Sequence, residues 1–259
     1  MNSLIEHARF RWSSSASHLR LIMKPVWWIA VVATLTVLGM SALQAPAATE
    51  DGVALAIVYD TSGSMKEPVP SGSGGQAPKY VIANRALENV TRRIEAFATN
   101  TAGGAPRVIQ AGLFVFANTS AREAIRFGAF NPSAFHSWAR TFSNPTGWTP
   151  LGNALSAAGK AVLDSNLSRK HVLVITDGMS NSGPDPKDVM PKLKAQAAQK
   201  EAIVSVHFIA FDVNASVFDP VKKLGATVVS ASNETQLNSQ LEFILARKIL
   251  LEDETPPKK

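Results

Sequence analysis

The stretch Val53–Met65, VALAIVYDTSGSM, changes character sharply in its middle. Six successive apolar residues and Tyr59 are followed at once by the polar run Asp60-Thr61-Ser62-Gly63-Ser64. An apolar run that does not alternate with polar residues is typical of a strand covered on both faces of a sheet. The sequence therefore predicts a central strand at 53–59 that ends in a cluster of side-chain oxygens.

Strand-like and helix-like patterns alternate along the rest of the chain. The further predicted strands are 108–116, 171–176, 202–210 and 226–230, with a weaker one near 122–127. Between them apolar residues recur at helical spacing, in stripes that run over 83–97, 151–162, 217–224 and 237–245. This alternation predicts an α/β fold with a single, doubly wound, mostly parallel central sheet flanked by helices. We assign this domain to residues 48–250.

The first 47 residues are predicted to be a basic segment followed by a signal peptide or a membrane anchor. No charged residue occurs from Pro25 to Thr49, and the stretch 26–43 is strongly apolar, with basic residues on its N-terminal side. Ala45-Pro46-Ala47 fits a signal-peptidase site, whereas an uncleaved segment would be an anchor. Translation from either Met1 or Met23 fits this pattern. Both alternatives predict export: the domain would be periplasmic or secreted, or anchored outside the cytoplasm.

Composition narrows the function classes. The 259-residue chain has no cysteine, which excludes disulfides and thiolate metal sites. Its net charge is +6, but no dense basic patch with interleaved aromatic residues is present, which argues against nucleic-acid binding. Residues 251–259 are predicted to be a disordered tail.

Three predicted loops bring oxygen-bearing side chains to one edge of the sheet. They are 60–64 after the first strand, 146–152 before a helix, and 176–178 after the strand 171–176. Ligands of such sheets bind at the carboxyl ends of the strands, near the reversal of strand order. Hydroxyls and carboxylates without histidine or cysteine suit Mg²⁺, Ca²⁺ or Mn²⁺ and not Zn²⁺.

In order and placement, DTSGSM (60–65), GWTPLGNAL (147–155) and ITDG (175–178) resemble the metal-ion-dependent adhesion site of von Willebrand factor A domains, of the bacterial exported type. The resemblance implies a Rossmann-like fold of this family and a divalent cation, Mg²⁺ first, with Ca²⁺ and Mn²⁺ as alternatives. It also implies one open coordination position for a carboxylate from a protein partner. The implied metal ligands are Asp60, Ser62, Ser64, Thr149 and Asp177.

Two features depart from the family's usual pattern. Trp148 stands before the threonine of the second loop, where family members often have a small residue, and the loop 66–78 is long and rich in Gly, Pro and Ser. We expect both on the rim of the site, where they would influence the choice of partner. Asp212 and Asn118, which end strands, are further rim candidates.

Each loop also allows a purely structural interpretation. Asp60 and the two serines can stabilise a turn, Thr149 can cap the helix that begins with Pro150, and Asp177 can form a turn with Gly178. The function predicted is a non-enzymatic protein-binding module. The alternatives are an accessory subunit of an ATPase-linked assembly, a metal-free structural domain and a metal-assisted hydrolase. No catalytic residue is predicted, because no nucleophile elbow or phosphate loop is present. His171 and His207 are expected to be buried in the sheet.

Overall fold

The computed structural model describes residues 49–72, 74–100 and 107–250. The predicted N-terminal segment 1–47, its cleavage site and the tail 251–259 lie outside the described residues. Among the residues that are described, no helix has the length and apolar character needed to cross a membrane.

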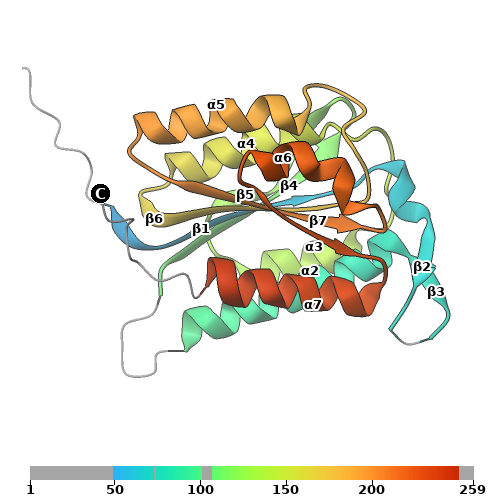
Figure 1. Ribbon diagram of the computed structural model, residues 1–259. Coiled ribbons are helices and arrows are strands. Elements are labelled where there is room, and N and C mark those ends of the chain that lie inside the picture. Colours follow the sequence, from blue (N-terminus) through green and yellow to red (C-terminus); the bar gives the residue numbers. More distant parts are fainter. Residues whose placement is uncertain (1–48, 73, 101–106, 251–259) are drawn as a thin grey trace, which may run out of the picture. The chain divides into compact units, whose positions relative to one another are not determined.

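The core of the domain is a six-stranded sheet (Figure 1). Its strand order is β5-β4-β1-β6-β7-β8, and every neighbouring pair is parallel except the hairpin of β4 and β5. The predicted α/β fold with a mostly parallel central sheet is therefore confirmed. The strands are β1 (Glu50–Tyr59), β4 (Ile109–Ala117), β5 (Ser120–Ala129), β6 (Leu167–Thr176), β7 (Val204–Phe211) and β8 (Thr227–Ala231).

Helices cover both faces of this sheet (Figure 1). One face carries α2 (Lys79–Thr99), α3 (Pro132–Thr141) and α7 (Glu234–Ile244), and the other carries α4 (Leu151–Asp164), α5 (Pro186–Gln199) and α6 (Asp219–Lys223). Alternate residues of β1 contribute to two separate cores: Leu55 and Ile57 to the first, Ala56 and Val58 to the second. The uninterrupted apolar run of β1 is thus explained by burial on both faces.

Two helices, α3 and α5, were not expected from the apolar stripes, although both begin with recognisable start signals. The Asn131 side chain accepts a hydrogen bond from the N–H of Ala134, and the Asp185 side chain accepts one from Lys187. In each case a proline follows the capping residue.

The stripe predicted as one helix at 217–224 is divided into a 3-10 helix, Ala215–Phe218, and α6. Pro220 lies in the first turn of α6 and cannot donate a backbone hydrogen bond, so the helical bonding pattern starts afresh there.

The long loop 66–78 contains the short antiparallel strands β2 (Pro68–Pro70) and β3 (Gln76–Pro78). Glu234 at the start of α7 holds this hairpin. Its carboxylate accepts hydrogen bonds from Ser71 Oγ at 2.9 Å and from the N–H of Gly72 at 2.8 Å. An ion pair of 2.9 Å joins the same carboxylate to Arg85 in α2. The hairpin is therefore anchored to both helices beside it.

Two buried histidines, His171 in β6 and His207 in β7, lie within the sheet as expected. Their rings are stacked, and His171 Nδ1 lies 3.3 Å from His207 Nε2. Burial, followed by the charges of His207 and Arg169, lowers the pKa of His171 to about 3. Burial, followed by the charge of Lys248, lowers the pKa of His207 to about 4. Both rings are therefore neutral in the folded domain near pH 7.

Candidate metal centre

The site lies where the order of the strands reverses. Asp60 directly follows β1 and Asp177 directly follows β6, and these strands are neighbours in the sheet. From β1 the sheet extends through β4 and β5 on one side and through β6, β7 and β8 on the other. The loops after β1 and β6 therefore separate at this point and leave room for a ligand.

Asp60 places a carboxylate in the interior of the site. It is fully buried; Oδ1 accepts a hydrogen bond from the N–H of Ser62 at 2.8 Å, and Oδ2 accepts one from Thr176 Oγ1 at 2.7 Å. Burial, and then the negative charge of Asp177, raise the pKa of Asp60 to about 6. Within the described ranges no lysine or arginine forms an ion pair with it. A cation bound here would offset the cost of burying this charge.

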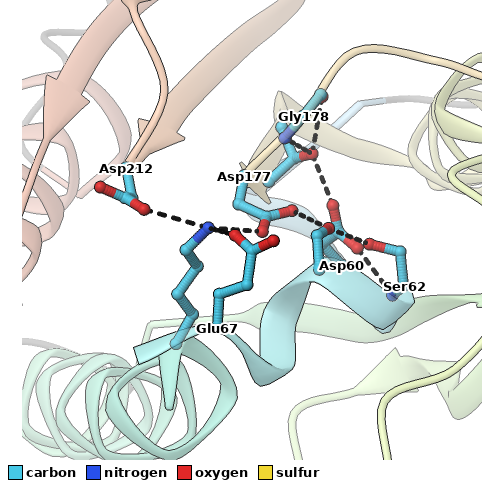
Figure 2. Close-up of polar contacts among 9 residues, drawn as sticks. Asp60, Ser62, Glu67, Asp177, Gly178 and Asp212 are labelled. Carbon is cyan, nitrogen blue, oxygen red and sulfur yellow. Dashed lines mark hydrogen bonds and ion pairs between the residues drawn. The ribbon is translucent and has the colours of Figure 1, made fainter. Parts of the chain in front are cut away.

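The two serines connect Asp60 to the second aspartate (Figure 2). Ser62 Oγ and Ser64 Oγ lie 3.1 Å apart, and Ser64 Oγ donates a hydrogen bond of 2.8 Å to Asp177 Oδ1. Four of the five predicted ligands are therefore in one continuous group of polar contacts. The turn-forming contact between Asp60 and Ser62 is also present, so the structural interpretation describes part of what Asp60 does.

The fifth predicted residue, Thr149, lies in a loop that is bonded to the loop 60–64. Thr146 N–H donates to the carbonyl of Thr61 at 2.8 Å, and the N–H of Gly63 donates to the carbonyl of Gly147 at 3.3 Å. Thr149 itself is buried, but it does not cap α4, because the N-cap position is taken by Pro150. The purely structural role considered for Thr149 in the sequence, capping the helix that follows, is therefore not the one it has.

The loop that contains Asn181 is hydrogen-bonded to the backbone of Thr149. The N–H of Thr149 donates to Asn181 Oδ1 at 2.6 Å, and the N–H of Asn181 donates to the carbonyl of Thr149 at 3.1 Å. The same loop passes over Gly152 in the first turn of α4, close to the backbone of Pro184. The position of Thr149 thus depends on close packing between two backbones.

Replacing Gly152 with alanine should disturb this packing. A Cβ at this position would lie 2.0 Å from the carbonyl oxygen of Pro184, a backbone atom that cannot rotate away. We expect a loss of roughly 1–3 kcal/mol in the free energy of unfolding, the usual cost of overpacking, measured by urea denaturation. Gly128→Ala, in β5, is the matched control, because a Cβ there would have no atom within 4 Å. Equal stability of the two variants would contradict this account.

The sequence did not reveal Lys79, the first residue of α2, whose ammonium lies beside Asp177. Its Nζ is 3.1 Å from Asp177 Oδ2, 2.8 Å from Glu67 Oε2 and 3.0 Å from Asp212 Oδ2. Burial opposes the charge, but Glu67, Asp212 and Asp177 outweigh it and hold the pKa of Lys79 above its ordinary value. One signal was available: a basic residue at the start of a helix opposes the helix dipole, which favours acidic residues there.

The contacts of Asp212 and the exposure of Trp148 are compatible with the rim positions expected for them. Asp212 contacts Lys79, whereas Asn118 lies exposed in the β4–β5 turn. Trp148 is 58% exposed, and Met179, two residues after Asp177, is 53% exposed. The contacts between Thr149 and Asn181 hold together the two loops that carry these exposed residues.

The donor set fits a hard divalent cation. Carboxylate and hydroxyl oxygens are the ligands that Mg²⁺ and Ca²⁺ prefer, and among the described residues no lysine or arginine forms an ion pair with the buried carboxylate of Asp60. In that part of the chain no group of three or more His, Cys, Asp or Glu side chains is arranged to hold a metal as it stands, because the three carboxylates around Lys79 already pair with its ammonium. An ion at this edge of the sheet would therefore need the hydroxyls as well as the two carboxylates.

Comparisons with known proteins agree with this architecture. A search of curated proteins found no match. Among solved structures, a D319A mutant of the PilB minor pilin from Streptococcus sanguinis aligns with a TM-score of 0.57 and 17% identity, covering 78% of this chain and 62% of that one. Proximal thread matrix protein 1 from the mussel byssus, with a zinc-occupied MIDAS motif, aligns with a TM-score of 0.53 and 16% identity, covering 76% and 48%.

The vWF domain of the type V pili tip protein Mfa5 from Porphyromonas gingivalis aligns with a TM-score of 0.51 and 13% identity, covering 76% of this chain and 95% of that one. This chain therefore spans less than two thirds of the pilin and about half of the mussel protein. At these identities the likeness shows the fold alone. The sequence profile of the von Willebrand factor type A domain matches residues 54–243, which is most of the chain. The chain therefore belongs to the von Willebrand factor type A domain family.

Proposed function

We propose that this protein is an exported, non-enzymatic binding module that recognises a carboxylate of a protein partner through a divalent cation. Asp60, Ser62, Ser64, Thr149 and Asp177 would hold the cation. Mg²⁺ is the proposed ion, with Ca²⁺ and Mn²⁺ as alternatives. A hard cation that keeps exchangeable waters can accept one more anionic ligand, which gives the partner its point of attachment.

One observation carries this proposal: the buried Asp60 carboxylate lies at the reversal of strand order with no lysine or arginine paired to it in the described structure. Asp60 is linked to Asp177 through the backbone N–H of Ser62 and the hydroxyls of Ser62 and Ser64, and each hydroxyl is also a ligand type suited to a hard cation. A turn alone would not require the carboxylate to be fully buried. A bound cation accounts for both the burial and the choice of donors.

The relatives support the proposal without carrying it. Two are described as a pilin and a pilus tip protein, and the mussel protein as having zinc in this type of motif. Surface proteins of this kind agree with the export predicted from residues 1–47. Export itself is tested by sequencing the N-terminus of the mature protein, which should begin near Ala48 or, for an anchored form, at Met1 or Met23.

The carboxylate requirement can be tested with a displayed library of random peptides. The full chain, purified in mild detergent and immobilised, is exposed to the library in Mg²⁺, and bound peptides are eluted with a chelator. We expect the selected peptides to contain Asp or Glu, and replacement of that residue by Asn or Gln to abolish binding. Peptides that bind equally well in chelator, or that lack any carboxylate, would contradict the proposal.

Trp148 should contribute to the affinity for such peptides. Exposed tryptophans beside a binding site are frequent hot spots, and truncating one typically costs more than about 1 kcal/mol of binding free energy. Trp148→Ala should therefore weaken peptide binding roughly five- to tenfold, as measured by titration calorimetry, without changing the melting temperature.

Ile203→Ala is the matched control for this prediction. Ile203 is 68% exposed and precedes β7, at the opposite end of the strand from the site. The Ile203→Ala variant should bind the selected peptides as tightly as the natural chain does. A large fall in the melting temperature of Trp148→Ala would show instead that Trp148 is needed for folding.

A further inference from the structure

Lys79 places a positive charge among three carboxylates that come from separate parts of the chain. Glu67 follows the 3-10 helix Gly63–Lys66, Asp177 follows β6 and Asp212 follows β7. Figure 2 shows the three carboxylates directed at one ammonium nitrogen, and each has an oxygen within 3.1 Å of Lys79 Nζ. We refer to Glu67, Asp177 and Asp212 as the acidic triad.

This arrangement is specific, because several of its parts are unfavourable in isolation. The Lys79 side chain is only 3% exposed, although lysine is rarely buried without a partner. It lies at the end of α2 where the helix dipole disfavours a cation. Asp212 has a φ of 56°, a left-handed conformation that costs energy outside glycine. The three contacts to the triad offset these costs.

Asp177 is shared between the ammonium and the proposed metal centre. Its Oδ1 accepts the hydrogen bond of Ser64, while its Oδ2 lies against Lys79. The two oxygens of one carboxylate are thus divided between two positions, each suited to a cation. Lys79 occupies one of these positions, and Oδ1 of the carboxylate is directed toward the other.

We propose that Lys79 is a built-in cation that takes the place a second metal ion would otherwise occupy, so that the site holds a single divalent ion. This inference rests on the proposed function, because the single ion is the one held by Asp60, Ser62, Ser64, Thr149 and Asp177. Lys79 is a positioning residue: it acts on the ion through Asp177.

Removing the ammonium should leave three carboxylates around one vacancy. The side chain of Asp177 is fully buried, and leaving its charge unpaired is costly, whereas the side chains of Glu67 and Asp212 are 65% and 38% exposed. A cation that enters the vacancy would relieve this cost and the repulsion among the three carboxylates. Carboxylate oxygens are suitable ligands for a hard divalent ion. Lys79→Met keeps the length and apolar stem of the side chain and removes only the charge, so we expect this variant to bind two divalent ions where the natural chain binds one.

The experiment uses Mn²⁺ alone as the probe, with the full chain in mild detergent. Titration calorimetry should give a stoichiometry of one for the natural chain and two for Lys79→Met. The paramagnetic resonance spectrum of the variant should show two interacting Mn²⁺ ions, because Asp177 would lie between them. A merely structural role of Lys79 would change stability but would not produce this coupled spectrum.

Lys66→Met is the matched control. Lys66 is exposed and lies in the 3-10 helix of the same loop, so the variant makes the same change of charge near the site. It should keep a stoichiometry of one. If Lys79→Met fails to fold, Lys79→Met/Asp212→Asn has one charge fewer in the vacancy and should still bind two ions, the second more weakly.

The possible results separate this inference from the proposed function. A folded Lys79 variant that binds one ion overturns the inference and leaves the metal centre intact. A natural chain that binds no ion, together with a Lys79→Met chain that binds one, refutes the proposed function and shows only that Lys79 occupies a cation position. Absence of binding to both chains overturns both.

Discussion

Replacing Asp60 with asparagine should abolish the stabilisation of the domain by divalent cations. Asp60 supplies a full charge at the centre of the site, whereas the serines and Thr149 supply only dipoles. With Mg²⁺ at a hundredfold excess over its dissociation constant, the natural chain should gain about 2.7 kcal/mol in the free energy of unfolding. The Asp60→Asn variant should gain none, and Asp177→Asn should gain less than the natural chain.

The same substitution should stabilise the metal-free domain, which makes the prediction unusually specific. Burial raises the pKa of Asp60 to about 6, so its ionised form costs stability, and this cost grows as the pH rises from the unfolded value of 3.8 through 6. At pH 7.5 asparagine avoids the cost, which is on the order of 2–3 kcal/mol for a shift of about two pKa units. Asp60→Asn should therefore melt at a higher temperature than the natural chain in chelator.

Thermal scans of the full chain in Mg²⁺ and in chelator measure both effects. Asp185→Asn is the matched control: Asp185 caps α5, and asparagine caps a helix about as well as aspartate. The control should keep the Mg²⁺-dependent rise in melting temperature. The scans should be repeated with a selected acidic peptide, because its carboxylate is the proposed ligand that completes the coordination of the ion. A rise in melting temperature that persists in Asp60→Asn would disprove its role as a ligand.

Acid should destabilise the domain through the buried pair His171 and His207. Their pKa values in the folded state, about 3 and about 4, lie below the ordinary value of 6.5. At pH values between the folded and the ordinary pKa, the unfolded chain therefore binds more protons than the folded domain. Stability is complete above pH 6.5 and falls as the pH drops below it. At pH 5 the expected loss is about 2 kcal/mol for each histidine, from roughly 1.4 kcal/mol per pH unit.

The double variant His171→Leu/His207→Leu should lose this part of the pH dependence. Leucine has a similar volume and cannot take up a proton, so the free energy of unfolding, measured in urea at pH 7, 6 and 5, should fall less steeply. Each single variant, His171→Leu or His207→Leu, should remove only part of the acid-dependent loss. Parallel curves for the natural chain and the double variant would show that the pair does not control acid stability.

The central part of the fold could be predicted from the sequence because it depends on local patterns. The uninterrupted apolar run at 53–58 indicated a strand buried on both faces, and the order of strands and helical stripes indicated a doubly wound sheet. Placing Asp60, Ser62, Ser64 and Asp177 together required only that parallel strands end at the same edge of a sheet. Helices α3 and α5 were not predicted, because the prediction relied on apolar stripes. A capping residue followed by proline marks the start of each helix and was an available signal.

The contacts of Lys79 were decided by the tertiary structure alone. Lys79 and Asp177 are separated by 98 residues, and neither has a neighbour in sequence that predicts their contact. A salt bridge depends on where side chains meet in space and on how much water the fold removes from around them, and no periodic pattern in the sequence records either. The sequence thus determined the sheet and the loops at its edge, whereas the folding of α2 and the ends of β6 and β7 against one another determined which charges share the site.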